Sequence, residues 1–582
     1  MKIAHIFNEV DTNENKFYIS GCFDIDYIDA VIDAFKSGEK ECEVGCSDLN
    51  NEEYNKALKP INESKIIDEY DNEKIDNAVE GLGDEVLLLS GDFFGIQDFI
   101  FNGLETKKAA KIIRARSAMV QLITKAVANE LKDRIDAMEV LFGAGKFLMV
   151  CDVAKKEEIK KIQKTLNEYF FNNYFGLSGV VLSYERAKKK DVIRIEENKE
   201  IKEVLSKLAL NNEKVKLNKF DLTNRENFVI DIFDNAKTED EVCEFCKKRL
   251  KKDEACIICE NEIKLGTLLT KFDSVSIKVK EKEKFSWDEV FILKIDNKVY
   301  YAKFGDNEDF DISNDKMTKK PKWPLKAYVP SSQKGIKTFE EIEGNLSGLM
   351  MLKADIDRLG NTFKKFYYDS FKKFNRLSRE INFFFANYVP YVIKQNYPNI
   401  YVVFAGGDDL FLIGPYVEVV EFAKDIREKF YNFTLQKATL SMGLVMFKHS
   451  TPVLYVNEEA EKAEKRAKSV KKDNKDRNGI DLFGVSMKFD EFKDIEDKWQ
   501  KIYKKDDMPM SFLYRLIEII NMASEMESNP KNAIWRSKLS YIVNRNFKEI
   551  EFLKELVELI EEYKGKMLPS IYLTIYKRRD DG

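Results

Sequence analysis

Three aspartates in the second half of the chain have the type and spacing of a metal-binding site. Asp355 ends the apolar run GLMMLKADI, and Asp408 and Asp409 follow two glycines in IYVVFAGGDDLFLIG. A carboxylate at the end of a strand can emerge at a sheet edge, where adjacent strands bring such groups together. Three carboxylates at one point repel each other unless a divalent cation is bound, and Mg²⁺ or Mn²⁺ accepts these oxygen ligands. The ordinary alternative is a solvated Asp-Asp hairpin turn.

Two divalent cations held by these aspartates would organise in-line attack of a 3′-hydroxyl on an α-phosphate, which is nucleotidyl transfer of the palm type. Gly406 and Gly407 supply unusual backbone angles and let a phosphate or metal approach closely, so they are candidate nucleotide-binding residues. Ile356, next to Asp355, is a further candidate. Lys468 lies in the helix expected after the last strand and could meet triphosphate charge, although a solvated lysine face is the commoner explanation for any single lysine.

The elements around these residues are predicted to occur twice. Residues 86–190 and 341–500 both read as strand, helix, β-hairpin, helix and strand, a βαββαβ order that is typical of ferredoxin-like units. The spacing from Asp92 to Ala144 nearly equals that from Asp355 to Gly406. The sequence therefore predicts an internal repeat, with one candidate site in its second copy.

The first copy lacks the tip aspartates, because its hairpin tip reads Gly143-Ala144-Gly145-Lys146. Asp92 alone cannot hold two metals, so we interpret this copy as a pseudo-symmetric partner whose surface completes a nucleotide pocket. Ser117 and Ser378 occupy similar places in the two intervening helices and are candidate contacts for a base or sugar. A serine on a helix is more often simply solvated.

The cysteines give a second strong pattern, two C-x-x-C pairs formed by Cys243, Cys246, Cys256 and Cys259. Two such pairs at this distance suit a tetrahedral Cys₄ zinc site, in which every coordination position is filled and the role is structural. The alternative of four unrelated thiols is improbable at this spacing. The site would stabilise a lysine-rich lobe between the two copies.

Composition excludes several other classes of protein. Net charge is −5, so no global basic field indicates nucleic-acid binding, and no apolar run approaches the ~20 residues of a membrane span. With no signal peptide pattern, the expected location is the cytoplasm. The only histidines, His5 and His449, lack a following Asp, so no HD-type nuclease site can be assembled from them.

The expected fold class is α+β with several domains. These are an N-terminal segment (1–85), a degenerate first palm domain (86–190), a zinc-containing small domain (191–340), a second palm domain with GGDD (341–500) and a C-terminal helical bundle (501–582).

The combination of motifs resembles a known family. AGGDDLFLIG in the second copy, SGDFFGIQDFIF and RARS in the first, the Cys₄ insertion and the C-terminal helices are similar to the large subunit of type III CRISPR effector complexes, the Cas-ten family. The III-A (Csm) form is the most similar. The resemblance covers nearly the whole chain from about residue 86, and this set of motifs is specific.

The resemblance implies an antiviral enzyme that joins ATP by 3′–5′ bonds into cyclic oligoadenylates when the complex binds target RNA. It makes Asp355, Asp408 and Asp409 the metal ligands and places Ser117 and Ser378 near two ATP sites. It also implies a Csm-four-like subunit, small subunits, guide RNA and target RNA as partners. Many relatives begin with an HD nuclease domain, which this sequence does not show, so no HD-dependent DNase activity is expected.

Two other functions remain open from the residues alone. A diguanylate cyclase shares the palm and a similar hairpin, but it pairs two active half-sites, whereas the first copy here lacks metal ligands. A silent scaffold for guide RNA and subunits is the second alternative. An intact set of carboxylates argues against it, because an unused cluster destabilises the fold through repulsion.

Overall fold

The computed structural model describes residues 2–4, 41–43, 69–101, 108–194, 198–218, 241–251, 253–272, 274–305, 310–311, 328–333, 335–360, 370–407, 409–434, 436–472, 475–505, 508–547 and 549–581. Most of the N-terminal segment predicted at 1–85, including His5, lies outside these residues, as does Asp408.

The first sheet has four antiparallel strands in the spatial order β4-β5-β3-β6. Helices α5 and α6 connect its strands, which gives the βαββαβ element order along the chain. The elements are β3 (Glu85–Phe94), α5 (Ala109–Ile135), β4 (Met138–Gly143), β5 (Lys146–Asp152), α6 (Lys156–Tyr174) and β6 (Gly179–Lys188). Helix α8 (Lys199–Leu217) follows and packs against β6.

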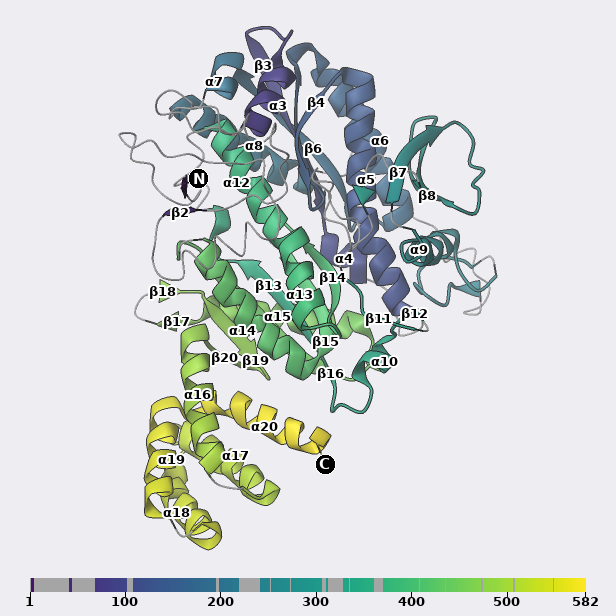
Figure 1. Cartoon of the computed structure of the whole chain (residues 1–582). Coiled ribbons are helices and arrows are strands. Elements are labelled where there is room, and N and C mark those ends of the chain that lie inside the picture. The colour runs from purple at the N-terminus through teal and green to yellow at the C-terminus, as the bar shows by residue number, and fades with distance from the viewer. Residues whose placement is uncertain are drawn as a thin grey trace.

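The second sheet repeats this order and extends it (Figure 1). Its spatial order is β14-β15-β13-β16-β19-β20, and only the β16–β19 pair is parallel. The strands are β13 (Leu349–Ile356), β14 (Tyr401–Gly406), β15 (Asp409–Pro415), β16 (Leu440–Phe447), β19 (Gly479–Leu482) and β20 (Val485–Lys488). The added strands β19 and β20 were not part of the sequence prediction.

Three helices of the second copy pack on its sheet, and the first of them is interrupted by a π-helical turn. The helix between β13 and β14 is formed by α12 (Phe371–Phe383), the π-helical turn η4 (Phe384–Tyr388) and α13 (Val389–Asn396). Pro390 cannot donate a backbone hydrogen bond, and the π-helical turn just before it accommodates that loss. Helix α14 (Tyr416–Phe433) precedes β16, and α15 (Val453–Ser469) follows it.

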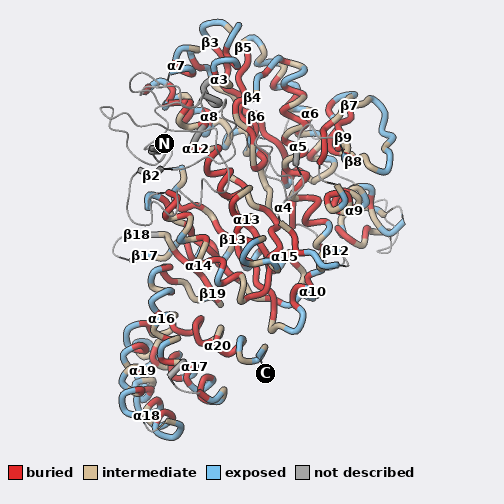
Figure 2. Tube along the Cα trace, viewed as in Figure 1, coloured by how far each residue is buried: buried red, intermediate tan, exposed pale blue. Residues whose placement is uncertain are grey.

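The second sheet is buried on both faces, which explains the almost continuous apolar run of β13. Met350 and Leu352 pack in one core cluster with residues of α12–α14, whereas Leu349 and Met351 pack in another with residues of α5 and α15. Figure 2 shows buried segments concentrated in the strands and the inner helix faces of both copies. The first copy therefore covers part of the second copy's sheet.

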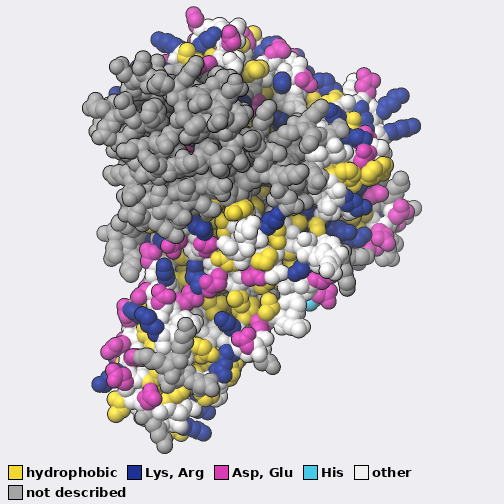
Figure 3. Space-filling model, in the orientation of Figure 1, with side chains coloured by type: hydrophobic (Ala, Val, Ile, Leu, Met, Phe, Trp, Pro, Cys, Tyr) yellow, Lys and Arg dark blue, Asp and Glu magenta, His cyan; other side chains and the backbone are white. Residues whose placement is uncertain are grey.

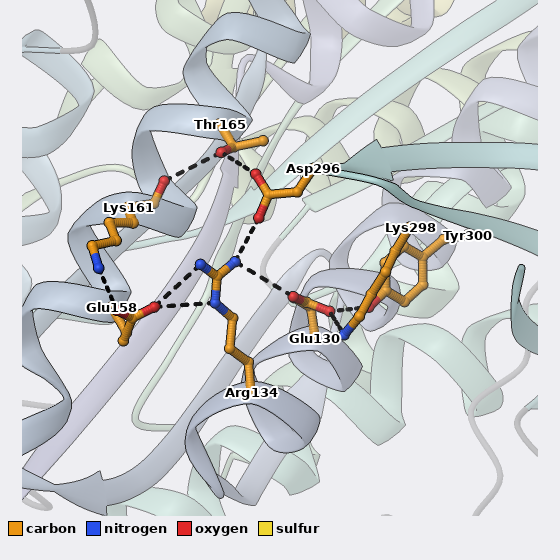
Figure 4. Close-up of polar contacts among 8 residues, drawn as sticks. All are labelled: Glu130, Arg134, Glu158, Lys161, Thr165, Asp296, Lys298 and Tyr300. Carbon is orange, nitrogen blue, oxygen red and sulfur yellow. Dashed lines mark hydrogen bonds and ion pairs between the residues drawn. The ribbon is translucent and has the colours of Figure 1, made fainter. Parts of the chain in front are cut away.

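The cysteine lobe lies beside the first sheet (Figure 1). It contains α9 (Ile257–Leu268) and a sheet ordered β10-β7-β9-β8, formed by β7 (Ser274–Lys280), β8 (Glu289–Ile295), β9 (Lys298–Phe304) and β10 (Phe310–Asp311). Arg134 of α5 donates to Asp296 at 2.7 Å, in the turn between β8 and β9, and also to Glu158 of α6 at 3.2 Å (Figure 4). Glu130 binds Lys298 at 2.8 Å and also Tyr300. These contacts attach the small sheet to the first copy.

The chain ends in helices that extend away from the second sheet, at the bottom of Figure 1. They are α16 (Phe489–Lys505), α17 (Met510–Ser524), α18 (Trp535–Asn546), α19 (Ile550–Tyr563) and α20 (Leu568–Asp581). The buried Trp499 donates to Thr574 at 2.9 Å and joins α16 to α20.

The remaining elements are short. They are β1 (Lys2–Ala4), β2 (Glu41–Glu43), α3 (Glu69–Val79), α4 (Ile96–Phe101), η1 (Val153–Lys155), α7 (Lys189–Ile193), β11 (Ser331–Ser332), β12 (Gly335–Ile336), α10 (Phe339–Glu343), β17 (Lys471–Lys472), β18 (Lys475–Asp476), η5 (Pro530–Ile534) and η6 (Lys564–Met567).

The surface carries charges of both signs. The coloured part of Figure 3 intersperses basic and acidic side chains, as the near balance of 96 Lys and Arg with 101 Asp and Glu leads one to expect. Within the described part of the chain, none of the helices has the length and apolarity that crossing a bilayer requires.

The packing of α15 against β16 gives a first prediction. A Cβ built on Gly443 would lie 2.3 Å from the backbone nitrogen of Glu464 and 2.8 Å from the carbonyl oxygen of Ala460. We expect Gly443→Ala to displace α15 and lower the free energy of unfolding by about 1–3 kcal/mol, measured by urea denaturation. Gly83→Ala is the control, because no atom lies within 4 Å of its Cβ position. Equal stability of the two variants would contradict this packing.

Candidate active site

The two described aspartates of the predicted site face each other across neighbouring strands. Asp355 of β13 pairs directly with Asp409, the first residue of β15. Directly opposed residues of an antiparallel pair point to the same face, with Cβ atoms about 5 Å apart. Adjacent carboxylates are hard oxygen donors and fit Mg²⁺ or Mn²⁺. The register thus brings Asp355 and Asp409 together, while Asp408 lies outside the described residues.

The glycines before the aspartates let the two hairpin tips meet. A Cβ on Gly406 would lie 3.0 Å from the Cβ of Ala144, at the tip of the first copy, and one on Gly407 would lie 3.2 Å from it. Asn382 of α12 accepts a hydrogen bond from the Gly407 N–H at 2.9 Å. Gly407 has φ +63°, which favours glycine. The sequence predicted close approach of a phosphate or metal here, and the structure adds the approach of the first hairpin.

Lys468 reaches the candidate site from α15. Its ammonium lies 2.5 Å from Oδ2 of Asp355 and also binds Glu464, one helical turn earlier. Burial works against the charge of Lys468, but attraction and hydrogen bonding to Asp355 and Glu464 together outweigh it and raise the pKa of the lysine. The sequence-predicted Lys468 is therefore in direct contact with a predicted metal ligand.

Asp357 has a different role from Asp355, although it lies only two residues away. Its carboxylate accepts hydrogen bonds from Thr439 Oγ1 and Ser441 Oγ at 2.7 Å each, and from the backbone N–H of Asn478 at 2.8 Å. The side chain is buried. These bonds fix the end of β13 to β16 and to the segment before β19, so Asp357 positions the strand that carries Asp355. Sequence analysis gave no role to this residue.

The first copy contains a counterpart of the aspartate–lysine pair. Lys216 of α8 lies 2.8 Å from Oδ2 of Asp92, which is near the end of β3 much as Asp355 is near the end of β13. Burial opposes the charge of Lys216, yet attraction to Asp92 raises its pKa. Sequence analysis missed Lys216, because α8 follows the first repeat after a break in the pattern.

A cavity of about 360 Å³ lies between the two copies. Ser90, Asp92 and Asn212 line it from the first copy, and Ser378, Asn382 and Gly407 line it from the second. The Ser378 hydroxyl donates to the carbonyl oxygen of Phe374 at 3.0 Å, which leaves its lone pairs for a ligand. Ser117 lies half-buried in α5 and is not among the lining residues. Ser378 and Gly407 of the second copy thus line the same cavity as Asp92 of the first copy.

The four predicted cysteines converge. All four Sγ atoms lie within 4.8 Å of one another, and all four residues are buried. Cys246 Sγ and Cys256 Sγ are 3.9 Å apart. A tetrahedral zinc site with Zn–S bonds of about 2.3 Å requires Sγ atoms about 3.8 Å apart, so these thiols fit the ion. Hydrogen bonds from the neighbouring thiols, Cys246 first, lower the pKa of Cys243 far below its ordinary range.

Helix α9 links the cysteine cluster to the first copy. Cys256 caps the helix, and its Sγ accepts the backbone N–H of Cys259. Further along α9, Glu262 pairs with Arg116 at 3.0 Å, and the carbonyl oxygen of Gly266 accepts from Arg114 at 2.8 Å. The RARS sequence of α5 is therefore an attachment point for the lobe.

Zinc binding gives the second prediction. Cys259→Ser removes one of four thiolate ligands, and we expect the purified chain to lose most of about one bound zinc per molecule. Metal content after gel filtration, measured by mass spectrometry, checks this.

Cys151→Ala is the matched control. Cys151 is also buried, but burial raises the pKa of its thiol to about 12, and it lies outside the cluster. It should keep the metal. Full zinc content in the Cys259→Ser protein would rule out the Cys₄ site.

Two family models match segments of this chain. The model "Cas10/Cmr2, second palm domain" matches residues 349–480, which contain the Asp355–Asp409 pair. The model "Csm1 subunit domain B" matches residues 85–234, which contain the first sheet and α8.

Curated relatives are named CRISPR system single-strand-specific deoxyribonuclease Cas10/Csm1 (subtype III-A). The protein from Streptococcus thermophilus is 24% identical over 536 residues, covering 85% of this chain and 66% of the relative. That from Methanocaldococcus jannaschii is 24% identical over 564 residues, covering 81% and 68%. The chain thus spans about two thirds of the length of these relatives.

Solved structures of Csm1–Csm4 cassettes share the fold. The apo cassette matches with a TM-score of 0.63 and 20% identity, covering 88% of this chain and 75% of the other. The cassette in complex with AMPPNP matches with a TM-score of 0.65 and 19% identity, covering 99% and 84%.

Proposed function

We infer that this chain, whose homologues are the Cas10/Csm1 large subunits of type III-A CRISPR systems, joins ATP into cyclic oligoadenylates at the site around Asp355 and Asp409. The observation that carries this proposal is the direct pairing of these two carboxylates at the end of β13, inside the segment that matches the second palm model. The reaction is 3′–5′ nucleotidyl transfer dependent on divalent cations.

The ligands of related structures support adenine nucleotides as substrates. Csm1–Csm4 cassettes with this fold were solved in complex with ATP, with the linear products pppApA and pppApApA, and with cA3 and cA4. We propose the same substrate and product class for this chain.

The residues of the site divide the work of the reaction. Asp355 and Asp409, with Asp408 as a predicted third ligand, would hold Mg²⁺ or Mn²⁺. When bound, the cations polarise the α-phosphate and lower the pKa of the attacking 3′-hydroxyl. Lys468 donates to Asp355 and is placed to bind triphosphate oxygens once that carboxylate ligates a cation. Ile356, Gly406 and Gly407 remain predicted nucleotide contacts through their backbone.

The first copy would supply the second nucleotide position. Its cavity of about 360 Å³ combines Asp92 with Ser378 and Gly407 from the second copy, so both copies contribute to one space. The Lys216 ammonium beside Asp92 provides a positive charge where the first copy lacks tip carboxylates. By the symmetry of the repeat, Ser117 of the first copy would contact the nucleotide that binds at the second copy.

We propose a Csm4-like subunit, small subunits, guide RNA and target RNA as partners, with target RNA switching the reaction on. The cysteine cluster would hold a structural Zn²⁺, and the complex would act in the cytoplasm as part of antiviral defence. The absence of HD-dependent DNase activity remains an expectation from sequence.

Turnover of labelled nucleotides gives the third prediction. The chain, alone and assembled with subunits, guide and target RNA, is incubated with each NTP and Mg²⁺ or Mn²⁺, and the products are resolved by chromatography and mass spectrometry. We expect cyclic oligoadenylates from ATP, reduced about a hundredfold or more in Asp355→Asn and Asp409→Asn because each removes a charged ligand.

Asp136→Asn is the control, since Asp136 is an exposed cap of α5 far along the chain from the site. No product from any nucleotide in the assembled complex would overturn the proposal and leave a scaffold role.

Removal of Lys468 gives the fourth prediction. In the nucleotide-free chain Lys468 competes with a divalent cation for Asp355, so Lys468→Met is expected to raise Mn²⁺ affinity about three- to tenfold. The same change removes a phosphate contact, and turnover of ATP should fall about tenfold or more. Calorimetric titration and product analysis measure the two effects. Lys465→Met, on the exposed side of the same helix, should change neither. A loss of both affinity and turnover would contradict competition at Asp355.

A further inference from the structure

The carboxylate of Glu464 bridges two lysines beside the candidate site. Its Oε1 binds the ammonium of Lys468, which in turn binds Asp355. Its Oε2 lies 3.3 Å from the ammonium of Lys353. Glu464 is buried in α15, at 6% exposure, so its charge has to be balanced by these neighbours. Glu464 is thus a second carboxylate partner of Lys468, beside Asp355.

Lys353 extends this network to the first copy. It lies within β13 and is only 3% exposed, an unusual place for a lysine. Its ammonium donates to Oε1 of Gln97 at 2.6 Å and lies 5.0 Å from the centre of the Phe411 ring. Gln97 belongs to α4, which follows β3 of the first copy. A continuous chain of polar contacts therefore joins the first copy to Asp355.

The first copy contains a neutral version of the same arrangement. Asn212 precedes Lys216 by one helical turn, as Glu464 precedes Lys468, and it donates to Ser90 Oγ at 3.0 Å. Ser90 lies two residues before Asp92, as Lys353 lies two before Asp355. Both copies thus hold an aspartate–lysine pair, but only the second supports its lysine with a buried carboxylate and a buried ammonium.

This difference follows the chemistry expected of each copy. A buried ion pair costs desolvation energy, and the first copy shows that a serine and an asparagine can fill the same positions. The charged pair is present where a divalent cation would take Asp355 away from Lys468. Lys468 then still needs an anionic partner to keep its position, and Glu464 is the neighbouring carboxylate that already binds it.

We propose that Glu464 is a positioning residue for nucleotidyl transfer, which holds Lys468 at the triphosphate when Asp355 binds a cation, and that Gln97 of the first copy fixes Glu464 through Lys353. The inference rests on the proposed function, and it deepens the account of the same site. It also gives a physical use to Gln97 in the first-copy motif SGDFFGIQDFIF.

The test compares the isosteric change Glu464→Gln with the matched change Glu461→Gln. Glu461 is on the same helix and lies 3.5 Å from Lys353, but its ion pairs are with Lys353 and Lys465 rather than with Lys468. We expect Glu464→Gln to lower kcat about ten- to a hundredfold, because the change removes one charge-assisted hydrogen bond to Lys468. The KM for ATP should change less. Glu461→Gln should stay within about twofold of the unmodified chain.

A double-variant cycle separates positioning from general damage to the fold. If Glu464 acts through Lys468, then Glu464→Gln has no further effect on kcat once Lys468→Met is present. If the double variant turns over too slowly to measure, the same four proteins can be compared by their Mn²⁺ affinity, measured by titration without nucleotide. There Glu464→Gln should weaken Mn²⁺ binding about threefold with Lys468 present and leave it unchanged without Lys468.

The double variant Lys353→Ser, Glu464→Asn reproduces the neutral pair of the first copy. Its thermal midpoint should fall less than that of Glu464→Gln, while its kcat should stay low. If Glu464→Gln lowered kcat by the same factor with Lys468 present and with Lys468→Met, the positioning role would be overturned. An active Glu464→Gln enzyme with unchanged kcat and KM would overturn it as well. Failure of the proposed function is distinct, because the unmodified chain would then yield no Asp409-dependent product at all.

Discussion

Electrostatic repulsion between two facing carboxylates is the constraint that organises this protein. The antiparallel register of β13 and β15 sets Asp355 opposite Asp409. Directly opposed residues carry Cβ atoms about 5 Å apart, and two unit charges at such a separation repel by about 3 kcal/mol for an effective dielectric of about 20. Nearby positive charge offsets this repulsion. Lys468 provides one such charge, and the proposed divalent cations would supply the rest.

Duplication explains how the fold can support this arrangement. The two copies meet at their hairpin tips, where Ala144 packs against Gly406 and Gly407. Each copy covers a surface that the other would otherwise expose, and the space between them is the 360 Å³ cavity. One copy can then lose its tip carboxylates without losing its structural role. Equivalent helix positions hold Asn212 in the first copy and Glu464 in the second, so the two copies differ in charge beside their aspartate–lysine pairs.

Sequence reasoning found the parts of the site that local pattern determines. Strand periodicity and spacing gave the repeated element order, the Asp355–Asp409 region and the cysteine cluster, because each is marked by a short local pattern: a strand, a glycine-rich tip or a C-x-x-C pair. Asp357, Lys216 and Glu464 were missed, since their roles arise from contacts between elements that no periodicity reports. The strands β19 and β20 were missed for a similar reason, because they are short and follow a lysine-rich segment.

The RARS segment of α5 has a structural role that sequence analysis did not give it. Sequence analysis used it as a family marker, but Arg116 forms a buried ion pair with Glu262, and Arg114 contacts both Gly266 and the Tyr401 hydroxyl of β14. A buried ion pair is costly to desolvate, so it persists where geometry must be fixed. Here it holds α9, and with it the cysteine cluster, against α5 and the strand that leads to Gly406. The cysteine cluster is therefore connected through α9 and α5 to the junction of the two hairpins, although the cysteines take no part in the proposed reaction.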